Sequence, residues 1–501
     1  MKNLKYIILF LGLVACSDLD EQVYSEISPT NFYRNAEEAQ VAVTSIYNSY
    51  NRAISLFDFG LVSLVTVPSP KMVAIVPWRR IWGNYTLSAG DRLSLPRVWN
   101  PLYQGIFRAN TVLKELENRD FGSDDEEIKR KALIAETKWL RAWSYFNLVQ
   151  LFGDVPMPLE PTTTVEGAQL PRTPIINVYD QIISDLKDAE IDLPANKRPE
   201  NEIGRPIQAT AKFLLAKVYL TMAGLPLQDA NAMGLANTKL QEVLSLEDTN
   251  QGYKLLASYD DAIRIDNNDE RIFAMQQTQA VQGQGTAIGH VLAPRGKLAP
   301  GLGLSHIGYS QEFYDSFEET DERRDVTMAY SFVSRNGSIK TYNAPAPNGY
   351  AERLGIHQNK YVDLDQACCD GDPDMIVYRY SDALLMAAEI ENSLNGPTTV
   401  AYGHLNRVRA RANASDAPAD MTQEEFANYI YEERFKELSL EFQEVYDIRR
   451  LGKVEEALSQ HPENITFRPA NTAYSPNFNL WPLPLSEIQS NPNITENNPG
   501  W

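Results

Sequence analysis

A short segment of the chain combines aromatic, basic and amide side chains in a pattern that suits carbohydrate binding. Two tryptophans flank an Arg-Arg pair, and an asparagine and a tyrosine follow within three residues. A sugar ring offers apolar C–H faces on which an indole can stack, and hydroxyl groups with which guanidinium and amide groups can hydrogen-bond. The segment is therefore a candidate ligand site, with packing of the tryptophans against neighbouring helices as the alternative. Its candidate ligand-binding residues are Trp78, Arg80, Trp82 and Tyr85.

The segment above lies in a first irregular stretch of the chain, 56–96. A second irregular stretch, 280–361, is rich in glycine and tyrosine and offers further candidate residues. Loops of this length within a compact protein usually carry function, so we add Tyr309 and Tyr350 to the candidate site. A loop tyrosine more often packs locally, which is the alternative for both. We hypothesise that this stretch converges with the first irregular stretch, 56–96, in one outward-facing aromatic pocket.

Other kinds of active site find little support in the residue spacing. The five histidines lack the spacing of zinc ligands, and the glycine-rich run 283–289 departs from the dinucleotide-binding fingerprint. Asp370, Asp372 and Asp374 are spaced like the start of a calcium loop, but Met375 stands where glycine is needed. We therefore expect no catalytic residues, no metal site and no cofactor. Because 66 acidic residues make chance carboxylate pairs plentiful, a glycoside hydrolase stays as an alternative.

The charge balance argues against one broad class of function. The chain has 501 residues, of which 46 are Lys or Arg and 66 are Asp or Glu, so its formal net charge is −20. A protein that binds nucleic acid needs a basic surface to neutralise phosphates, so we expect no nucleic-acid partner. Hydrophobic residues make up 43% of the chain, which is enough for a large globular core.

The N-terminal residues have the features of an export signal. Lys2 and Lys5 precede an uncharged, mostly apolar run over 6–15, which is half the roughly 20 residues needed to span a bilayer. The Leu-Val-Ala-Cys sequence that ends at Cys16 resembles the lipobox of bacterial lipoproteins. We therefore predict a signal peptide over 1–15 and lipidation of Cys16 as the new N-terminus, with a buried N-terminal helix as the alternative. Two or more acyl chains on one residue anchor a protein stably to a membrane.

Helical periodicity dominates the rest of the chain. From 128 to 149 the apolar residues recur at steps of three and four, which places them on one helix face. Similar patterns predict helices over 36–50, 99–116, 175–189, 209–222, 238–246, 382–394, 404–413 and 422–451. Prolines and glycines interrupt the two irregular stretches, where we expect no long helix. The predicted fold class is all-α, mostly helical, with helix pairs of the tetratricopeptide type and long irregular loops.

Several phrases along the chain together resemble the SusD/RagB family of surface nutrient-binding lipoproteins. The phrases are Trp99-Asn100-Pro101-Leu102-Tyr103, Leu140-Arg141-Ala142-Trp143-Ser144-Tyr145-Phe146, Phe152-Gly153-Asp154-Val155-Pro156, Ala216-Lys217-Val218-Tyr219-Leu220, Tyr378-Arg379-Tyr380-Ser381-Asp382-Ala383, Leu405-Asn406-Arg407-Val408-Arg409, Glu432-Glu433-Arg434, Asp447-Ile448-Arg449-Arg450, Trp481-Pro482-Leu483-Pro484 and Asn497-Asn498-Pro499-Gly500-Trp501. Together the phrases span nearly the whole chain after residue 15. Their number and order make the match specific, which no single phrase would.

The resemblance implies a fold and a function. The fold would be a single SusD-like body with an N-terminal half over 16–270 and a C-terminal half over 271–501. The protein would be anchored in the outer membrane by its lipid, exposed at the cell surface, and would capture oligosaccharides for a SusC-like TonB-dependent transporter rather than act as an enzyme. A peptide ligand, a surface glycoside hydrolase and a purely structural subunit remain as alternatives. The fifth phrase continues to Glu389, and the charged residues Arg141, Arg379, Glu389, Arg434 and Asp447 would form ion pairs between helices.

The lipidation signal gives a direct prediction. Replacement Cys16→Ser removes the thiol that would carry the acyl chains, so we expect the protein to leave the membrane fraction and appear in the soluble fraction. Cell fractionation followed by immunoblotting measures this distribution, with Ser17→Ala as the control that keeps the thiol. A Cys16→Ser variant that stays with the membranes would contradict the predicted anchor.

Overall fold

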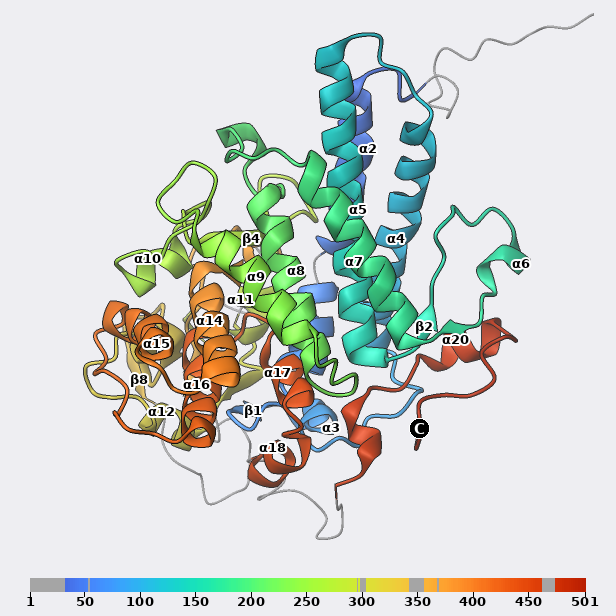
Figure 1. Cartoon of the computed structure of the whole chain (residues 1–501). Helices are drawn as coiled ribbons and strands as arrows, with labels where there is room; N and C mark the ends of the chain where they lie inside the picture. Colours follow the sequence, from blue (N-terminus) through green and yellow to red (C-terminus); the bar gives the residue numbers. More distant parts are fainter. Residues whose placement is uncertain are drawn as a thin grey trace, which may run out of the picture.

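The computed structural model describes residues 32–52, 55–294, 296–297, 303–341, 356–366, 369–461 and 474–501. The predicted signal peptide over 1–15, Cys16 and Tyr350 lie outside these residues. Most of the described chain is helical and its β-sheets are small, which confirms the predicted fold class (Figure 1). Within the described residues, no helix has both the length and the apolar character needed to cross a bilayer.

Four long helices lie side by side at the upper right of the molecule in Figure 1. They are α2 (Ala36–Tyr50), α4 (Leu95–Glu117), α5 (Asp124–Phe152) and α7 (Ile175–Asp192). α5 begins after Ser123, whose side chain accepts a hydrogen bond from the backbone N–H of Glu126, and it ends at Gly153, which has φ = +70°. Trp139 and Trp143 are buried on α5, as the helical period predicts.

The remaining longer helices pack in neighbouring pairs, α8 with α9 and α14 with α15. Their bounds are α8 (Gln208–Ala223), α9 (Ala232–Leu244), α14 (Tyr380–Asn395), α15 (Thr399–Arg411), α16 (Gln423–Leu438), α17 (Glu444–Arg450) and α18 (Val454–Gln460). The shorter helices are η2 (Pro77–Arg79), α3 (Arg80–Gly83), α6 (Val165–Ala168), η3 (Glu200–Glu202), α10 (Tyr259–Arg264), α11 (Ile288–Leu292), α12 (Gln311–Asp315), α13 (Arg323–Thr327), η5 (Pro476–Asn479) and α20 (Leu485–Ser490). One cluster of buried apolar side chains reaches from Tyr33 to Ile494.

Residues 56–66 differ from the prediction, because they form an eleven-residue π-helix, η1 (Leu56–Thr66), where we expected no long helix. Every residue of η1 except Phe59 is buried, so burial of this apolar run favours a helix despite the glycine within it. Gly60 lies so close to the backbone of Arg97 and to Val98 that a Cβ would not fit. The glycine thus permits close packing of η1 on α4 instead of ending the helix.

A small antiparallel sheet joins the two irregular stretches. Its strands, in spatial order, are β1 (Met72–Ala74), β5 (Ile307–Tyr309), β9 (Ile356–Gln358) and β6 (Met328–Ala329). β1 comes from the first stretch and the other three from the second, and Met72 pairs with Tyr309. The other strand pairs are β10 (Met375–Arg379) with β4 (Arg271–Met275), β2 (Val155–Pro156) with β3 (Arg172–Thr173), and β7 (Ser331–Val333) with β8 (Ile339–Thr341).

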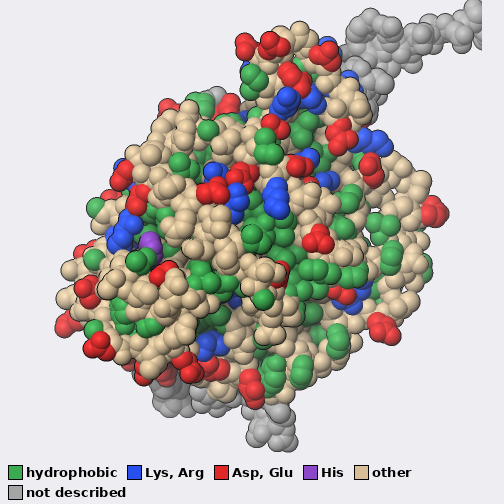
Figure 2. All heavy atoms as spheres, viewed as in Figure 1, with side chains coloured by type: hydrophobic (Ala, Val, Ile, Leu, Met, Phe, Trp, Pro, Cys, Tyr) green, Lys and Arg blue, Asp and Glu red, His purple; other side chains and the backbone are tan. Residues whose placement is uncertain are grey.

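Charged side chains occupy both the surface and the core. On the face shown in Figure 2, acidic side chains are scattered among basic ones rather than gathered in one patch. In the core, ion pairs connect helices at the residues that the family phrases predicted, which confirms their scaffold role. These pairs are Arg141–Asp185, Arg434–Asp382, Arg434–Asp447 and Arg450–Glu389.

The most extensive of these networks surrounds Arg379, which occupies the N-cap position of α14 but directs its side chain to other segments. Its guanidinium donates hydrogen bonds of 2.6–2.9 Å to the carboxylates of Glu270, Glu437 and Glu441. All four side chains are essentially inaccessible to solvent. Three arginines contact Glu437, namely Arg323, Arg379 and Arg411. Their charges hold the pKa of Glu437 well below its usual range, against the opposing effect of burial.

Removal of one carboxylate from this network should destabilise the fold. Glu437→Gln removes the negative charge that three buried guanidinium groups contact. We therefore expect a loss of about 3–5 kcal/mol in the free energy of unfolding. Because the pKa of Glu437 is lowered on folding, its stabilisation is present above the ordinary carboxyl pKa of about 4.5 and is lost as the pH falls toward its lower folded value. Urea unfolding at neutral and acidic pH measures both effects.

The matched control is Asp188→Asn, which removes a carboxylate from an exposed pair with Lys138. Surface pairs of this kind contribute about 0–1 kcal/mol, so this variant should unfold close to the parent protein. Equal stability of both variants would contradict the importance of the Arg379 network.

Candidate ligand-binding site

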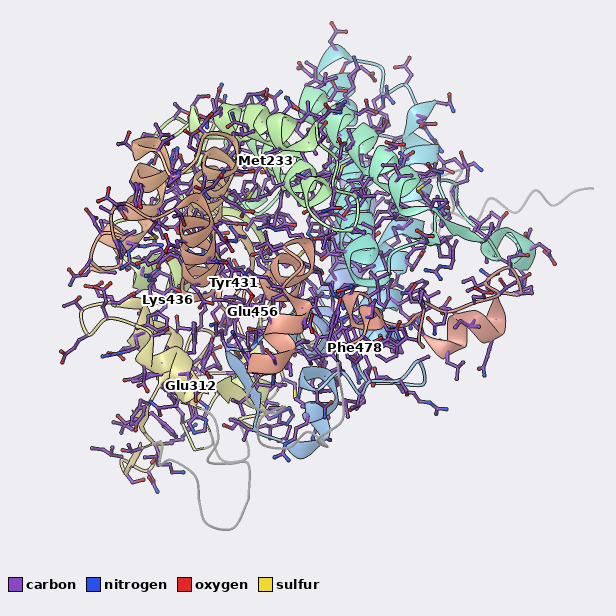
Figure 3. The ribbon with its side chains drawn as sticks, turned by 60° about the horizontal axis from the view of Figure 1, so that its bottom comes forward. Met233, Glu312, Tyr431, Lys436, Glu456 and Phe478 are labelled. Carbon is purple, nitrogen blue, oxygen red and sulfur yellow. The ribbon has the colours of Figure 1, made fainter. Side chains whose placement is uncertain are left out.

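Trp78 has the most exposed indole of the seven tryptophans, with 41% of the residue accessible to solvent. Its ring lies nearly parallel to that of Phe59, with centroids 6.4 Å apart, and it meets the imidazole of His306 edge-on at 5.3 Å. Phe59 comes from η1, Trp78 from η2 and His306 from the residue before β5. We call these three side chains the Trp78 platform. Figure 3 turns this side of the molecule forward, where β1 lies between Glu312 and Phe478.

Backbone hydrogen bonds fix the position of Trp78 relative to His306. The carbonyl oxygen of His306 accepts hydrogen bonds from the backbone N–H groups of Ile75 and Val76, at 3.0 and 3.3 Å. The N–H of Arg79 donates to the carbonyl of Val76 at 3.0 Å and closes the turn that carries Trp78. The small sheet therefore brings two segments more than 200 residues apart into contact at the platform.

Two of the aromatic candidates from the first irregular stretch belong to the core. Trp82 is fully buried and its indole N–H donates to Ser94 Oγ at 2.8 Å, so its polar atom is satisfied within the protein. Tyr85 is 2% exposed and stacks on Trp481 with centroids 5.0 Å apart. Burial of these large rings stabilises the connection to the C-terminal segment. In this structure neither ring presents a surface to a ligand, which corrects their expected role.

Tyr309 is also buried, because its ring and its hydroxyl both have partners within the protein. Its ring packs against Phe313 at 5.6 Å, and its hydroxyl accepts a hydrogen bond from Ser439 Oγ at 3.2 Å. Burial raises the pKa of this hydroxyl well above its usual value. Tyr309 thus supports β5 from the core side, and the local-packing alternative describes it correctly. Of the predicted ligand residues, the structure leaves Trp78 exposed and the neighbouring Arg80 half-buried.

A hollow of about 870 Å³ lies next to the same sheet. Tyr314 and Tyr330 contribute to its wall, and their ring centroids are 5.1 Å apart. Phe332, also in the wall, contacts the ring of His357 at 5.8 Å, and His357 Nδ1 lies 2.6 Å from Ser305 Oγ, next to the platform histidine. Its volume falls in the range of roughly 300–1,000 Å³ typical of small-molecule sites. The hollow borders β6, whereas the Trp78 platform lies beside β1 and β5, so the two sites lie at different edges of the sheet.

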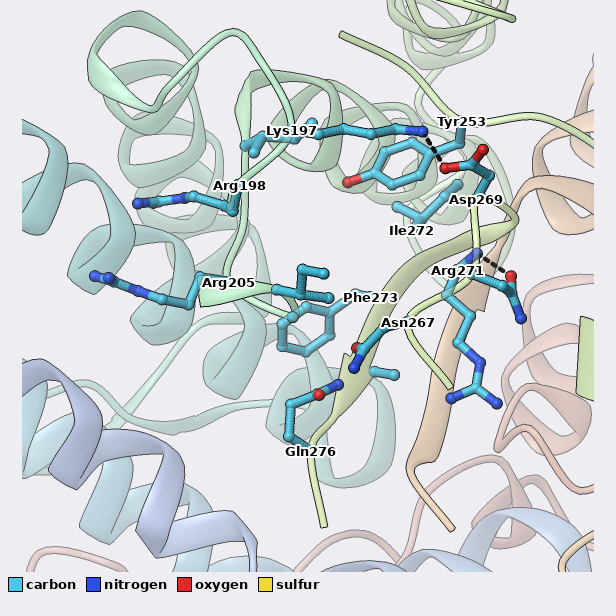
Figure 4. A pocket seen from close by; sticks show the side chains of 15 residues that line it. Lys197, Arg198, Arg205, Tyr253, Asn267, Asp269, Arg271, Ile272, Phe273 and Gln276 are labelled. Atoms are coloured by element: carbon cyan, nitrogen blue, oxygen red, sulfur yellow. Dashed lines mark hydrogen bonds and ion pairs between the residues drawn. The ribbon is translucent and has the colours of Figure 1, made fainter. Parts of the chain in front are cut away.

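Another cavity, of about 140 Å³, borders β4 and is shown in Figure 4. Several charged groups around it are already bound within the protein. Lys197 Nζ lies 2.6 Å from Asp269 Oδ1, and Arg205 pairs with Glu136 at 2.6 Å. We therefore interpret this cavity as a small polar gap in the scaffold and assign it no ligand.

The carboxylates that resemble a calcium loop have structural partners instead. Asp370 accepts hydrogen bonds from the backbone N–H groups of Gly283 and Gly285, each at 2.9 Å. Asp372 accepts hydrogen bonds from both the backbone and the side chain of Gln279. These aspartates thus hold the glycine-rich loop in place, and the described residues contain no group of three or more His, Cys, Asp or Glu side chains that could hold a metal ion.

Sequence reasoning missed Phe59 and His306 as members of the platform. Phe59 lies between Asp58 and Gly60 in a mostly apolar run, and the sequence does not show that it is the one residue of η1 that stays partly exposed. His306 lies far from Trp78 in the sequence and reaches it through the pairing of β1 with β5. The tyrosine richness of the second irregular stretch was the one signal for Tyr314 and Tyr330.

The different environments of the two tryptophans give a stability prediction. Trp82→Ala removes a fully buried ring and leaves Ser94 Oγ without its indole donor, so we expect a loss of about 3–5 kcal/mol in unfolding free energy. Trp78→Ala removes a partly exposed ring and should be much less destabilising. Urea unfolding of both variants measures the difference, and comparable losses would show that Trp78 is also a core residue.

Comparison with known proteins agrees with this fold. A model of the SusD family matches residues 252–501, and a model described as starch-binding and associating with the outer membrane matches residues 19–220. SusD-like protein P25 of Formosa agariphila is 27% identical, with 98% of this chain and 97% of that protein covered. Starch-binding protein SusD of Bacteroides thetaiotaomicron is 23% identical, with 80% and 77% covered.

Solved structures show the same fold. A SusD homologue from Bacteroides thetaiotaomicron superposes with a TM-score of 0.80 at 22% identity, over 95% of this chain and 99% of that one. A laminarin-binding SusD-like protein superposes with a TM-score of 0.76 at 27% identity, over 94% of this chain and all of that one. The chain belongs to the SusD/RagB family of SusD-like, glycan-binding proteins associated with the outer membrane.

Proposed function

We propose that this protein captures oligosaccharides at the Trp78 platform and delivers them to a SusC-like TonB-dependent transporter. The observation that carries the proposal is the exposed indole of Trp78, held by ring contacts with Phe59 and His306. The part of Trp78 that stays accessible to water gains nothing from burial on folding, so that part does not stabilise the protein where it stands. Stacking on the C–H face of a sugar would bury that area, which is how aromatic residues contribute to glycan affinity.

Capture at the cell surface follows from the same proposal. The family model that matches 19–220 is described by association with the outer membrane, and the sequence predicts a lipid on Cys16. A lipid anchor would keep the binding site near a transporter and raise its local concentration there. The transporter would then receive oligosaccharides too large to diffuse across the membrane unaided.

The alternatives differ from this proposal in chemistry. A glycoside hydrolase needs two carboxyl groups about 5–9.5 Å apart on either side of the scissile bond. In the described part of the chain, the side chains found against the Trp78 ring are Phe59, Arg79, Trp82 and His306. These aromatic and basic groups favour binding over hydrolysis at this place.

The test is a loss of glycan affinity on removal of the indole. Trp78→Ala should weaken the binding of oligosaccharides about tenfold, because an aromatic stacking contact contributes up to about 1.5 kcal/mol and about 1.4 kcal/mol corresponds to a factor of ten in affinity. Calorimetric titration with laminarin, alginate and carrageenan oligosaccharides measures the affinities. Phe107→Ala is the matched control, since Phe107 is an aromatic residue with similar exposure on α4 and does not belong to the platform.

The same samples separate the competing functions. New reducing ends after incubation would support the hydrolase, and binding of peptides but of no glycan would support the peptide-binding alternative. Unchanged glycan affinity of a folded Trp78→Ala variant would place the site elsewhere on the molecule.

A further inference from the structure

Arg79 is a fully buried cation that lies against the Trp78 platform. Its guanidinium carbon is 4.5 Å from the ring centroid of Phe59, 4.8 Å from that of Trp78 and 5.5 Å from that of Trp82. Nη1 donates a hydrogen bond of 3.3 Å to Ser63 Oγ, whereas Nε and Nη2 are buried without a hydrogen-bond partner. Contacts with ring faces compensate part of the desolvation of the guanidinium. An arginine in this position is nevertheless a costly choice for a scaffold, because buried N–H groups are normally all bonded.

Arg79 stays charged at neutral pH, and a second arginine, Arg97, lies close to one of the same rings. Burial, followed by the positive charge of Arg97, lowers the pKa of Arg79 to about 9, which still leaves it protonated at pH 7. The carboxylate of Asp58 opposes this shift, but Asp58 also accepts hydrogen bonds from Thr286 Oγ1 and the N–H of Ala287. Arg97 in turn lies over the ring of Phe59, with its guanidinium carbon 5.2 Å from the centroid. Two guanidinium groups therefore contact the rings of one platform.

The segment around the platform differs in charge from the rest of the protein. Between Phe59 and Asn100 the sequence has one acidic residue, Asp91, and five basic residues, Lys71, Arg79, Arg80, Arg92 and Arg97, in a chain whose net charge is −20. Asp91 accepts hydrogen bonds from the backbone N–H groups of Ser94 and Leu95 at the start of α4. Lys71 is paired with Glu432 at 2.7 Å. By formal charge this segment is therefore positive within an acidic chain.

We propose that the Trp78 platform selects anionic oligosaccharides, whose sugar rings stack on the indole while their carboxylate or sulfate groups interact with the surrounding arginines. The proposal rests on glycan capture at this platform and specifies the class of glycan. Guanidinium groups suit both anions, since they form charge-assisted and often bidentate hydrogen bonds with planar or tetrahedral oxyanions. The field of the buried Arg79 acts at the platform through a medium of low dielectric constant and is therefore weakly screened.

The experiment compares glycans that differ in charge. Alginate oligosaccharides carry uronate carboxylates, carrageenan oligosaccharides carry sulfate esters, and laminarin oligosaccharides are neutral. We expect at least one of the two anionic ligands to bind about tenfold or more tightly than laminarin at low salt. Its affinity should fall as the ionic strength rises from about 0.05 to 0.5 M, because salt screens exposed charges, whereas the affinity for laminarin should not change.

Two arginine variants test the residues themselves. Arg97→Gln and Arg79→Met should each weaken the anionic ligand about fivefold or more and change laminarin affinity less than about twofold. Arg79→Met replaces an incompletely bonded buried cation by an apolar side chain, so its urea midpoint should not fall, and it reports on binding rather than on folding. The control Arg34→Gln removes the same charge beside Glu38 before α2, and should change none of the affinities.

The outcomes separate this inference from the proposal on which it rests. Suppose that Trp78→Ala abolishes binding, but that the parent protein binds anionic and neutral glycans equally and that neither salt nor the arginine variants change its affinities. Selection by charge is then wrong, and glycan capture at the platform stands. If the arginine variants weaken laminarin as much as the anionic ligands, the arginines only support the platform structurally. If none of the glycans binds, or if an acidic peptide binds in their place, both proposals fail.

Discussion

The buried carboxylates around Arg379 determine how the C-terminal helices and the central strands fit together. Arg379 ends β10 and precedes α14. Its partners are Glu270, the residue before β4, Glu437 of α16, and Glu441 in the turn before α17. Each ion has lost its hydration, and the loss is tolerable only if every carboxylate meets its guanidinium in the correct geometry. The network thus demands one relative position of four segments, which a purely apolar core would specify less strictly.

The same network extends toward the Trp78 platform through a series of direct contacts. Lys360 Nζ contacts Glu441 and donates to the carbonyl of Ser439 at 2.9 Å, and Ser439 Oγ donates to the hydroxyl of Tyr309. Tyr309 lies on β5, which pairs with β1, and β1 leads to the turn that carries Trp78. Tyr309 therefore supports β5 from the core, and its burial is part of what holds the indole of Trp78 in place.

The sequence predicts the elements of this fold better than it predicts the site. Trp139 and Trp143 were assigned to the core correctly because the helical period alone decides which side of α5 they occupy. Trp78 and Trp82 carry the same local signal, and their difference comes from long-range partners: Ser94 satisfies the indole N–H of Trp82, whereas Trp78 meets His306 at the surface. η1 was missed because its glycine serves close packing against α4, a contact that no local pattern reveals.

Two features of the platform are uncommon in this molecule. Most of the buried guanidinium groups described, such as that of Arg379, meet carboxylates, and most tryptophans are buried. At the platform Arg79 meets rings and Ser63, as the buried Arg449 meets Trp481 and backbone carbonyls, and Trp78 is exposed. Both departures lower the stability of the free protein, and both concern groups that bind oligosaccharides well, an aromatic face and a cation. Natural sequences depart from local consistency chiefly at functional sites. The coincidence of the two departures in adjacent residues therefore argues for function more strongly than either the exposed ring or the buried charge alone.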